Sequence, residues 1–508
     1  MLAFKAKQFD DGLYAAVDLA AQHGAGKYPG KTSLFTELTR HLARGGLYGE
    51  MSSVVFAAAR LGGISVEQPG VMEPAVAQLI ERFLADESES KPLGFYTWTQ
   101  ELKRIFQQDR MLQSEVRGLR AIDEVAGALR DCGSTYAIYA DYLTLVARLT
   151  NPLAGSDLRD WSDPTSDDTS PRSFFPPSRA YETDLAKQLY ENTPIPEGFS
   201  LVQEMVQRIR DGRLRLKPTE KSGWYDYQTW ALEPLVLPEK MPEATKLEFS
   251  EEYRRHLVEL FKGIIALTRE THVKQLEHLA CGAARGLEPP RKEIYVSPRL
   301  SLEPLAEFYR RRAIAYSFIR EILADTFGAD GLKKMRRMTP DGPMELPLED
   351  ELGQMVALFR GAHGCVNREL ALLPSDALPQ LPEVSAAIST FQDWANRLDN
   401  DLDLGRDPRM MVPVFYDLER KKTKVWLVLG WEKRPLWISY ATPPTVHVKD
   451  KNGRAADTKV DIKFSGQYVF AAYPVSAEVY VSRLLNREEF QKHCDQYGTR
   501  EEILAKLM

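Results

Sequence analysis

The spacing of apolar residues changes at about residue 408, and this change constrains the fold more than any other feature of the 508-residue chain. Before it, apolar residues recur three and four positions apart, which is the period of amphipathic helices. After it, they alternate or form short runs rich in β-branched and aromatic residues, the pattern of strands. We therefore expect a mainly α protein, with a multi-helix body, a C-terminal antiparallel β domain and a short helical tail.

Glycine and proline breaks, together with one polar stretch, divide the chain further. Residues 1–150 are expected to form an N-terminal helical bundle. Residues 151–180 are rich in Asp, Ser and Pro and bury little, so they are expected to form a linker or long surface loop. A second helical region follows at 181–400. The β domain takes 401–482, and the helical tail takes 483–508.

Turn and cap signals support this division at the C-terminal end. The dipeptide Asn452-Gly453 is the strongest short hairpin signal in the β region. Several short strands so close together predict an antiparallel, sandwich-like sheet. In the tail, Asn486 and Thr499 are each followed three residues later by Glu, which is the spacing of a capping box, so two short helices are expected there.

The composition is that of an ordinary globular protein, with 44% hydrophobic and 27% charged residues. A net charge of −6 excludes a chain-wide basic field for nucleic acid. There is no apolar run of signal-peptide length at the N-terminus and no membrane-length apolar run elsewhere. The four cysteines are scattered, which argues against disulfides and a cysteine zinc site. We expect a cytoplasmic location and neither a membrane nor a nucleic acid as partner.

Residues 25–32, AGKYPGKT, match a relaxed form of the phosphate-binding loop. In such a loop Lys31 would contact the terminal phosphates and Thr32 would bind magnesium. A phosphate loop follows a buried strand, however, whereas residues 13–21 have a helical pattern. A turn between two helices is the favoured interpretation, and ATP is not expected as a cofactor.

Between residues 250 and 280, a helical plot at 100° per residue separates two polar groups of side chains. His272 falls on the apolar face, where it forms a polar cluster with Thr268 and Gln275. His256 and Glu270 fall on the opposite face, which is expected to be in contact with solvent. A histidine on an apolar face is more often a hydrogen-bonded core residue than a ligand, and both interpretations stay open here.

The same plot turns Arg312, His363 and Asp109 toward the apolar sides of three other helices, while Arg310 and Arg311 can point outward. A buried charge without a partner costs several kcal/mol. Arg312 therefore requires a carboxylate, either from the protein or from a ligand. Buried titratable groups from different helices form a functional site only where they meet.

Two functions from different classes fit these observations. The favoured one is a cytoplasmic, non-enzymatic binding or scaffold protein that engages another macromolecule. It depends on the absence of any strong catalytic motif and on a β domain with edge strands and tryptophans, namely Trp426, Trp431 and Trp437. The expected partner is a protein bound through the C-terminal β domain.

The alternative is a metal-dependent enzyme, of hydrolase or non-haem iron type, with a pocket among the helices. Its candidate catalytic residues are His272, His363, Arg312 and Asp109, and Arg312 would bind a substrate carboxylate or phosphate. The weak candidates for metal ligands are His272, His363 and Asp226, the last lying between two tyrosines in the aromatic segment 223–230. The cofactor is otherwise unknown, and a transition metal is compatible with this hypothesis.

Overall fold

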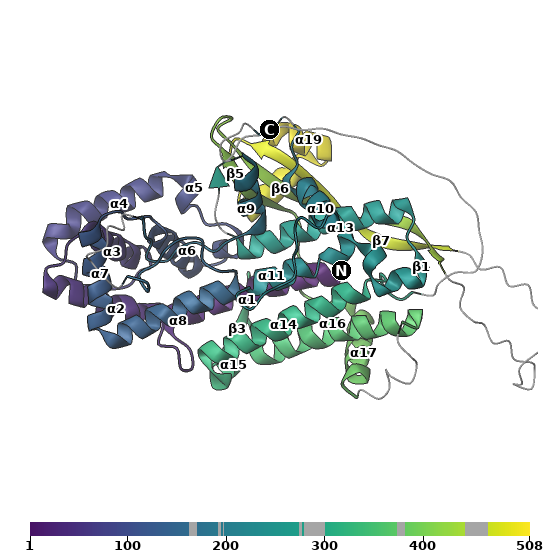
Figure 1. The fold of residues 1–508 in the computed structure, drawn as a ribbon, viewed down its shortest axis with the longest axis horizontal. Helices are drawn as coiled ribbons and strands as arrows, with labels where there is room; N and C mark the ends of the chain where they lie inside the picture. Colours follow the sequence, from purple (N-terminus) through teal and green to yellow (C-terminus); the bar gives the residue numbers. More distant parts are fainter. Residues whose placement is uncertain are drawn as a thin grey trace, which may run out of the picture.

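A computed structural model of the chain describes residues 1–161, 170–190, 195–196, 198–273, 277–278, 300–372, 382–441 and 466–508. It is mainly helical, with a C-terminal antiparallel sheet and two tail helices, which confirms the fold class expected from the periodicity (Figure 1). Among the described helices, none is both long enough and apolar enough to span a bilayer.

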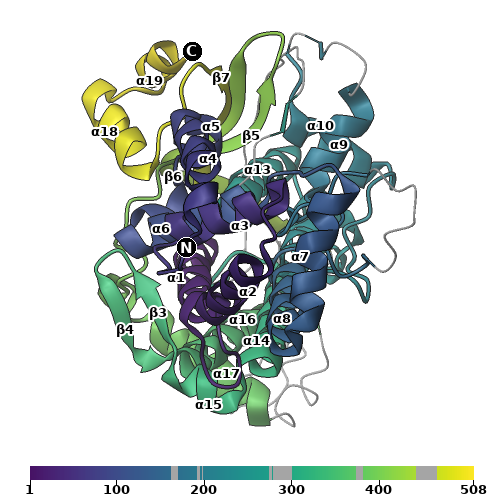
Figure 2. The same cartoon turned by 90° about the vertical axis from the view of Figure 1, so that its left-hand side faces the viewer.

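Helix α1 (Leu2–His23) runs through the centre of the molecule (Figures 1 and 2). Most of its 22 residues are buried, including its charged residues Lys7, Asp10, Asp11 and Asp18. Helix α13 (Glu251–His272) lies on one side of it, and helices α14 (Ala306–Phe327) and α16 (Leu348–Leu370) lie on the other (Figure 1). A central helix of this kind has no solvent face, so each of its charges needs a partner inside the protein.

The N-terminal helices gather around one end of α1 (Figure 1). They are α2 (Lys31–Gly45), α3 (Glu50–Leu61), α4 (Glu73–Ala85), α5 (Glu87–Ser90), α6 (Gln100–Leu112), α7 (Leu119–Asp131) and α8 (Gly133–Leu149). The remaining helices of the body are α9 (Tyr181–Tyr190), α10 (Leu201–Arg210), α11 (Trp224–Trp230), α12 (Glu233–Val236), α15 (Ala329–Lys334) and α17 (Pro382–Ala395). Short 3-10 helices are η1 (Gly70–Met72), η2 (Gly94–Thr97), η3 (Pro238–Lys240), η4 (Pro242–Thr245) and η5 (Leu398–Asn400).

The described part of the 151–180 segment is partly buried, and its aromatic side chains lie inside the protein. Trp161, Phe174 and Phe175 are all buried. The rings of Phe174 and Phe175 pack against Phe35 of α2 and Tyr139 of α8, and the Tyr139 hydroxyl donates to the Phe174 carbonyl at 3.0 Å. A few aromatic side chains therefore anchor a stretch whose average composition is polar.

The C-terminal sheet is built on a single long strand. Strand β6 (Lys422–Tyr440) pairs antiparallel with β5 (Met410–Asp417) and β7 (Gln467–Val481). Two short strands extend the sheet: β1 (Leu247–Glu248) joins the end of β6, and β2 (Glu277–His278) runs parallel to β5. The predicted hairpin at Asn452-Gly453 lies outside the described residues.

Helices cover both faces of the described sheet, where a sandwich would have a second sheet. Helix α13 packs on one face. The tail helices α18 (Arg487–Tyr497) and α19 (Arg500–Leu507) cover part of the other face, with Phe490 and Ile503 against Val425 and Leu427 (Figure 2). Both tail helices begin where the cap signals predict, and Asn486 forms a complete capping box with Glu489.

A second, two-stranded sheet lies against α1. It consists of β3 (Arg336–Thr339) and β4 (Gly342–Pro347), and Gly12 of α1 permits its close approach. A Cβ atom at Gly12 would lie 2.2 Å from the backbone oxygen of Met338. The glycine is therefore required by packing even though it weakens the helix.

Substitution of two helical glycines is expected to change stability in opposite directions. Gly12→Ala should lower the free energy of unfolding by about 1–3 kcal/mol, because the added methyl group overpacks the contact with β3. Gly127→Ala, in α7 with no atom within 4 Å of the added Cβ, should raise it by about 0.5–1 kcal/mol. Urea unfolding of both variants measures the difference. Stabilisation by Gly12→Ala would contradict the described packing of β3 on α1.

Candidate functional site

The segment that resembles a phosphate loop is a turn between α1 and α2, as the helical pattern before it predicts. Lys31 is fully buried, and its ammonium lies 2.8 and 2.6 Å from the two carboxylate oxygens of Asp109 on α6. The Tyr142 hydroxyl on α8 is 3.3 Å from the same ammonium. Lys31 thus forms an internal ion pair, and the prediction that Asp109 turns inward is confirmed.

A cavity of about 100 Å³ lies beside this ion pair. It is bounded by α1, α6 and α8, by the buried part of the 151–180 segment and by the end of α13. Its polar walls include two carboxylates, Asp18 and Asp109, and the side chains of Tyr14, Tyr96 and His272. The Tyr96 hydroxyl donates to Asp18. Asp109 and His272, both predicted from the sequence, therefore line the same cavity.

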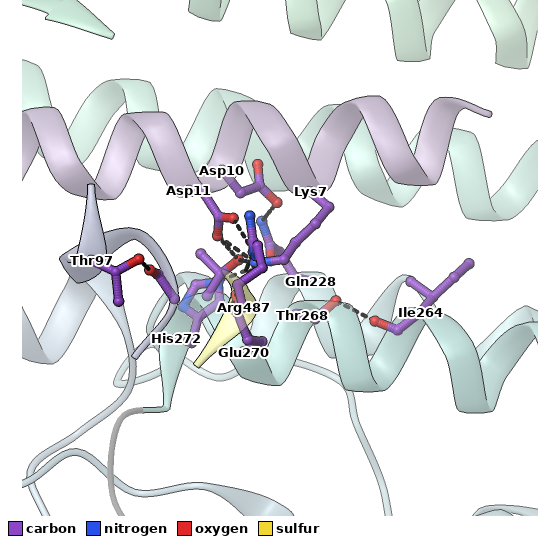
Figure 3. Close-up of polar contacts among 12 residues, drawn as sticks. Lys7, Asp10, Asp11, Thr97, Gln228, Ile264, Thr268, Glu270, His272 and Arg487 are labelled. Atoms are coloured by element: carbon purple, nitrogen blue, oxygen red, sulfur yellow. Dashed lines mark hydrogen bonds and ion pairs between the residues drawn. The ribbon is translucent and has the colours of Figure 1, made fainter. Parts of the chain in front are cut away.

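A chain of hydrogen bonds leads from the middle of α1 to this cavity. The Gln228 side-chain nitrogen on α11 donates to Asp10 at 2.9 Å, and the Gln228 oxygen lies 2.9 Å from His272 Nε2 (Figure 3). His272 Nδ1 is 2.6 Å from the Tyr14 hydroxyl. The sequence pattern placed His272 inside the protein correctly, but it gave no signal for Gln228 or Tyr14 as its partners.

The hydrogen-bond partners assign the imidazole tautomer. Asp10 accepts hydrogen bonds from Gln228, Arg312 and Tyr316, so it acts only as an acceptor. The amide nitrogen of Gln228 must then face Asp10, and its oxygen faces His272 Nε2, which therefore carries a proton. The lone pair of Nδ1 points at the Tyr14 hydroxyl.

The Tyr14 hydroxyl has a second partner in the protein. Its oxygen lies 2.6 Å from His272 Nδ1 and 2.8 Å from the carbonyl oxygen of Leu149. Burial raises the pKa of Tyr14 well above its ordinary value, so the phenol keeps its proton.

A cluster of four charged side chains, three buried and one half-buried, lies next to this chain of hydrogen bonds (Figure 3). Lys7 of α1 pairs with Asp11 and with Glu270 of α13. Arg487, at the start of α18, reaches both carboxylates, at 2.9 Å from Asp11 and 3.1 Å from Glu270. Two cations and two carboxylates therefore neutralise one another, and we refer to these four residues as the central ion cluster.

Two residues expected to face solvent on α13 are buried instead. Glu270 belongs to the central ion cluster, and His256 is buried with its Nε2 atom 2.7 Å from Glu303. The helical period correctly separates polar from apolar positions of α13. The sheet and α18, however, also contact its polar side, where His256 and Glu270 lie. Thr268, expected near His272, is buried and donates to the Ile264 carbonyl of its own helix, and Gln275 lies outside the described residues.

Arg312 is buried, as predicted, and its required carboxylate comes from the protein. Its guanidinium lies 3.2 Å from Asp10 and 3.0 Å from the Tyr316 hydroxyl. Asp10 therefore occupies the position next to Arg312 that the enzyme hypothesis assigned to the carboxylate or phosphate of a substrate. Arg310 is exposed, as expected, whereas Arg311 is buried beside Glu233 at 2.6 Å, because α12 covers that side of α14.

The structure does not bring the three candidate metal ligands together. His363 on α16 is half-buried, and its Nδ1 atom is 2.9 Å from the Ala306 carbonyl; burial lowers its pKa. Asp226 on α11 is buried with Ser222, Asn151 and Tyr181 as hydrogen-bond partners, and burial raises its pKa. Across the described ranges, no group of three or more His, Cys, Asp or Glu side chains is placed to hold a metal ion.

The tryptophans of β6 are less exposed than expected. Trp426 is buried, and Trp431 and Trp437 are half-buried, because their side chains pack against neighbouring elements. The exposed aromatic side chains are on β7 instead: Tyr468 is 46% exposed and Phe470 is 77% exposed. In the sequence, the only signal for this was that Tyr468 and Phe470 are two positions apart, a spacing that places both side chains on one face of a strand.

Removing Arg312 is expected to destabilise the protein more at neutral than at acidic pH. Burial raises the pKa of Asp10 above its ordinary value, and Arg312 opposes this shift. A raised carboxyl pKa means that stability falls as pH rises from the unfolded pKa to the folded one. Arg312→Met raises the pKa of Asp10 further and should cost about 3–5 kcal/mol at pH 7, and less near pH 4.5.

Urea unfolding at the two pH values measures this effect. Arg310→Met, the exposed arginine of the same helix, is the matched control and should change stability by less than about 1 kcal/mol. Adding Asp10→Asn to Arg312→Met should recover part of the loss. Equal losses at both pH values would show that Asp10 is not the charge that Arg312 neutralises.

No protein-family model matches the sequence, no curated protein matches it, and no solved structure matches it.

Proposed function

We propose that this chain is a binding protein that engages a protein partner through the ribbon formed by β6 and β7. One observation carries the proposal: Phe470, a large apolar side chain, is 77% exposed on an edge strand, with the half-exposed Tyr468 on the same face. Exposed aromatic side chains that cluster are typical anchors of protein interfaces.

The aromatic residues of β7 have apolar neighbours across the ribbon. Tyr468 is opposite Trp437, with ring centroids 5.1 Å apart, and Phe470 is opposite Pro435. We call these four residues the ribbon patch. Because side chains opposite one another in an antiparallel pair point to the same face, the patch is continuous across both strands.

The other face of the ribbon holds it in place. Leu436 and Ala471 point to that face and are buried in the main core, and β7 contacts α13. The tail helices pack near the other end of the sheet, around Leu427 and Val481. The ribbon thus presents its patch on a rigid support, which lowers the entropic cost of binding.

The outer edge of β7 offers a second means of binding. Within the described residues, β7 pairs only with β6, so from Tyr468 onward its other edge presents backbone N–H and C=O groups. An edge strand of 15 residues is long enough to pair with a strand of a partner. Backbone pairing would supply affinity, and the ribbon patch would supply selectivity for an apolar surface.

The alternative function, a metal-dependent enzyme, receives no such support. His272, His363 and Asp226 each have separate hydrogen-bond partners, and Arg312 is paired with a carboxylate of the protein itself. Binding through the ribbon is therefore the better-supported of the two functions.

The test is affinity capture with matched variants. The double variant Tyr468→Ser/Phe470→Ser removes both aromatic anchors of β7. Leu418→Ser is the control, because Leu418 is 68% exposed in the turn between β5 and β6, at another end of the same sheet. Proteins captured by the wild type and by Leu418→Ser, but lost with the double variant, are expected as the partners.

The interaction should also persist at high salt, because it depends on apolar area rather than on exposed charges. Circular dichroism should show unchanged helical content in both variants, since neither site contributes to the core. If the double variant captures the same proteins as the wild type, or if capture is lost equally with Leu418→Ser, the ribbon patch is not the binding surface.

A further inference from the structure

We propose that Cys132 is a reactive thiol, at which small electrophiles, and hydroperoxides in particular, modify the protein covalently. The site lies where the three N-terminal helices α2, α7 and α8 meet, and it does not depend on the function proposed for the ribbon. Three features carry the proposal: a histidine next to the sulfur, the position of the sulfur at the start of a helix, and the contrast with two other cysteines.

A nucleophile and a base come together here from two different helices. The Cys132 Sγ atom lies 3.3 Å from Nδ1 of His41, a residue of α2 that is 91 positions earlier in the chain. Cys132 is half-buried and forms no disulfide. At this distance the thiol proton can pass to Nδ1, which leaves a thiolate beside an imidazolium. The thiolate is the nucleophilic form of cysteine.

Two exposed carboxylates stand near this pair. An Asp131 oxygen lies 3.9 Å from Nε2 of His41, on the side of the ring away from the sulfur. Glu37, one helical turn before His41, accepts a hydrogen bond from the Ser134 hydroxyl at 3.3 Å. Both charges favour the imidazolium form of His41. Because both carboxylates are in water, their repulsion of a thiolate is weakened by solvent screening.

The start of α8 favours a negative charge on the sulfur. Cys132 ends α7 and is the N-cap residue of α8, a helix of 17 residues. The backbone amides of Gly133 and Ser134 have no acceptor anywhere in the described part of the chain. Such amides and the positive end of the helix dipole stabilise an anion at the N-terminus of a helix. They therefore add to the effect of His41, which supplies the base.

The site combines an open approach with a fixed base. A Cβ atom added at Gly133 would meet no other atom within 4 Å, so there is space next to Cys132 for a small reagent. The His41 ring is held in place because its neighbours on α2, Leu38 and Leu42, are fully buried and α2 packs on α7 and α8. A reagent can thus reach a sulfur whose base is already positioned.

The other two described cysteines lack these features. Cys365 and Cys494 are buried, and burial raises the pKa of Cys365 and raises that of Cys494 to about 11. Both therefore remain thiols at neutral pH. Cys281 lies outside the described residues. The structure thus offers two internal controls for the reactivity of Cys132.

A hydroperoxide would oxidise this thiol by two electrons. The Cys132 proton passes to His41, and the thiolate sulfur attacks the terminal peroxide oxygen, so that an S–O bond forms as the O–O bond breaks. The leaving alkoxide, or hydroxide from hydrogen peroxide, takes the proton from His41 and departs as an alcohol or as water. Cys132 is left as a sulfenic acid, and the peroxide is reduced.

Alkylation and oxidation of the full-length chain test the proposal. A free thiol is only a few per cent thiolate at pH 7, so we expect iodoacetamide to label Cys132 about tenfold faster than glutathione. Peptide mapping by mass spectrometry assigns a rate to each cysteine, and Cys365 and Cys494 should stay unlabelled while the protein is folded. After a stoichiometric amount of hydrogen peroxide, dimedone should trap a sulfenic acid on Cys132.

Two of these measurements can overturn the proposal on the wild-type chain alone. A rate at Cys132 no greater than that of glutathione would show an ordinary thiol. Absence of a dimedone adduct on Cys132, or equal adducts on Cys365 and Cys494, would show that the site does not direct oxidation.

Matched histidine variants test the role of the base. His41→Gln keeps a polar side chain but removes the base, and should slow alkylation of Cys132 about tenfold. His23→Gln is the control, because His23 is an exposed histidine at the end of α1 that pairs with Glu101. In unfolding concentrations of urea, His41→Gln and the wild type should react equally. An unchanged rate in folded His41→Gln, an equal loss in His23→Gln, or a difference that persists in urea would each contradict activation by His41.

Discussion

The structure depends on neutralising the charges of α1, a helix that has no solvent face. Lys7, Asp10, Asp11 and Asp18 all lie inside the protein, and each is matched by groups from distant parts of the chain. Leaving one such charge unmatched costs several kcal/mol, which is comparable to the whole stability of many domains. The packing of α11, α13, α14 and α18 around α1 is therefore fixed by charge as well as by apolar area.

Much of the architecture could be predicted from the sequence, because apolar periodicity is a local property. It distinguished the helical body from the strands after residue 408, placed the tail helices at their caps, and turned Arg312 and Asp109 inward. The partners of those residues could not be predicted. Asp10 precedes Arg312 by 302 positions, and nothing in the sequence around either residue indicates the pairing.

What the sequence patterns missed, on α13 and between residues 151 and 180, has one common cause. A helical plot assumes one buried and one solvated face, but α13 lies between α1 and the sheet, so part of its polar face is covered as well and His256 and Glu270 are buried. Between 151 and 180, composition likewise gave no sign that Phe174 and Phe175 pack together inside the protein. In both places the contacts that bury these side chains come from elements distant in the sequence. A pattern taken over a short stretch of residues does not include those contacts.

The position of Arg487 in the central ion cluster has a consequence for synthesis of the protein. Lys7 and Asp11 lie on α1, whereas Arg487 follows Asp11 by 476 positions along the chain. Until the segment around Arg487 has left the ribosome, the two carboxylates of the cluster share a single cation. The charges around α1 are thus balanced only once α18 has been synthesised.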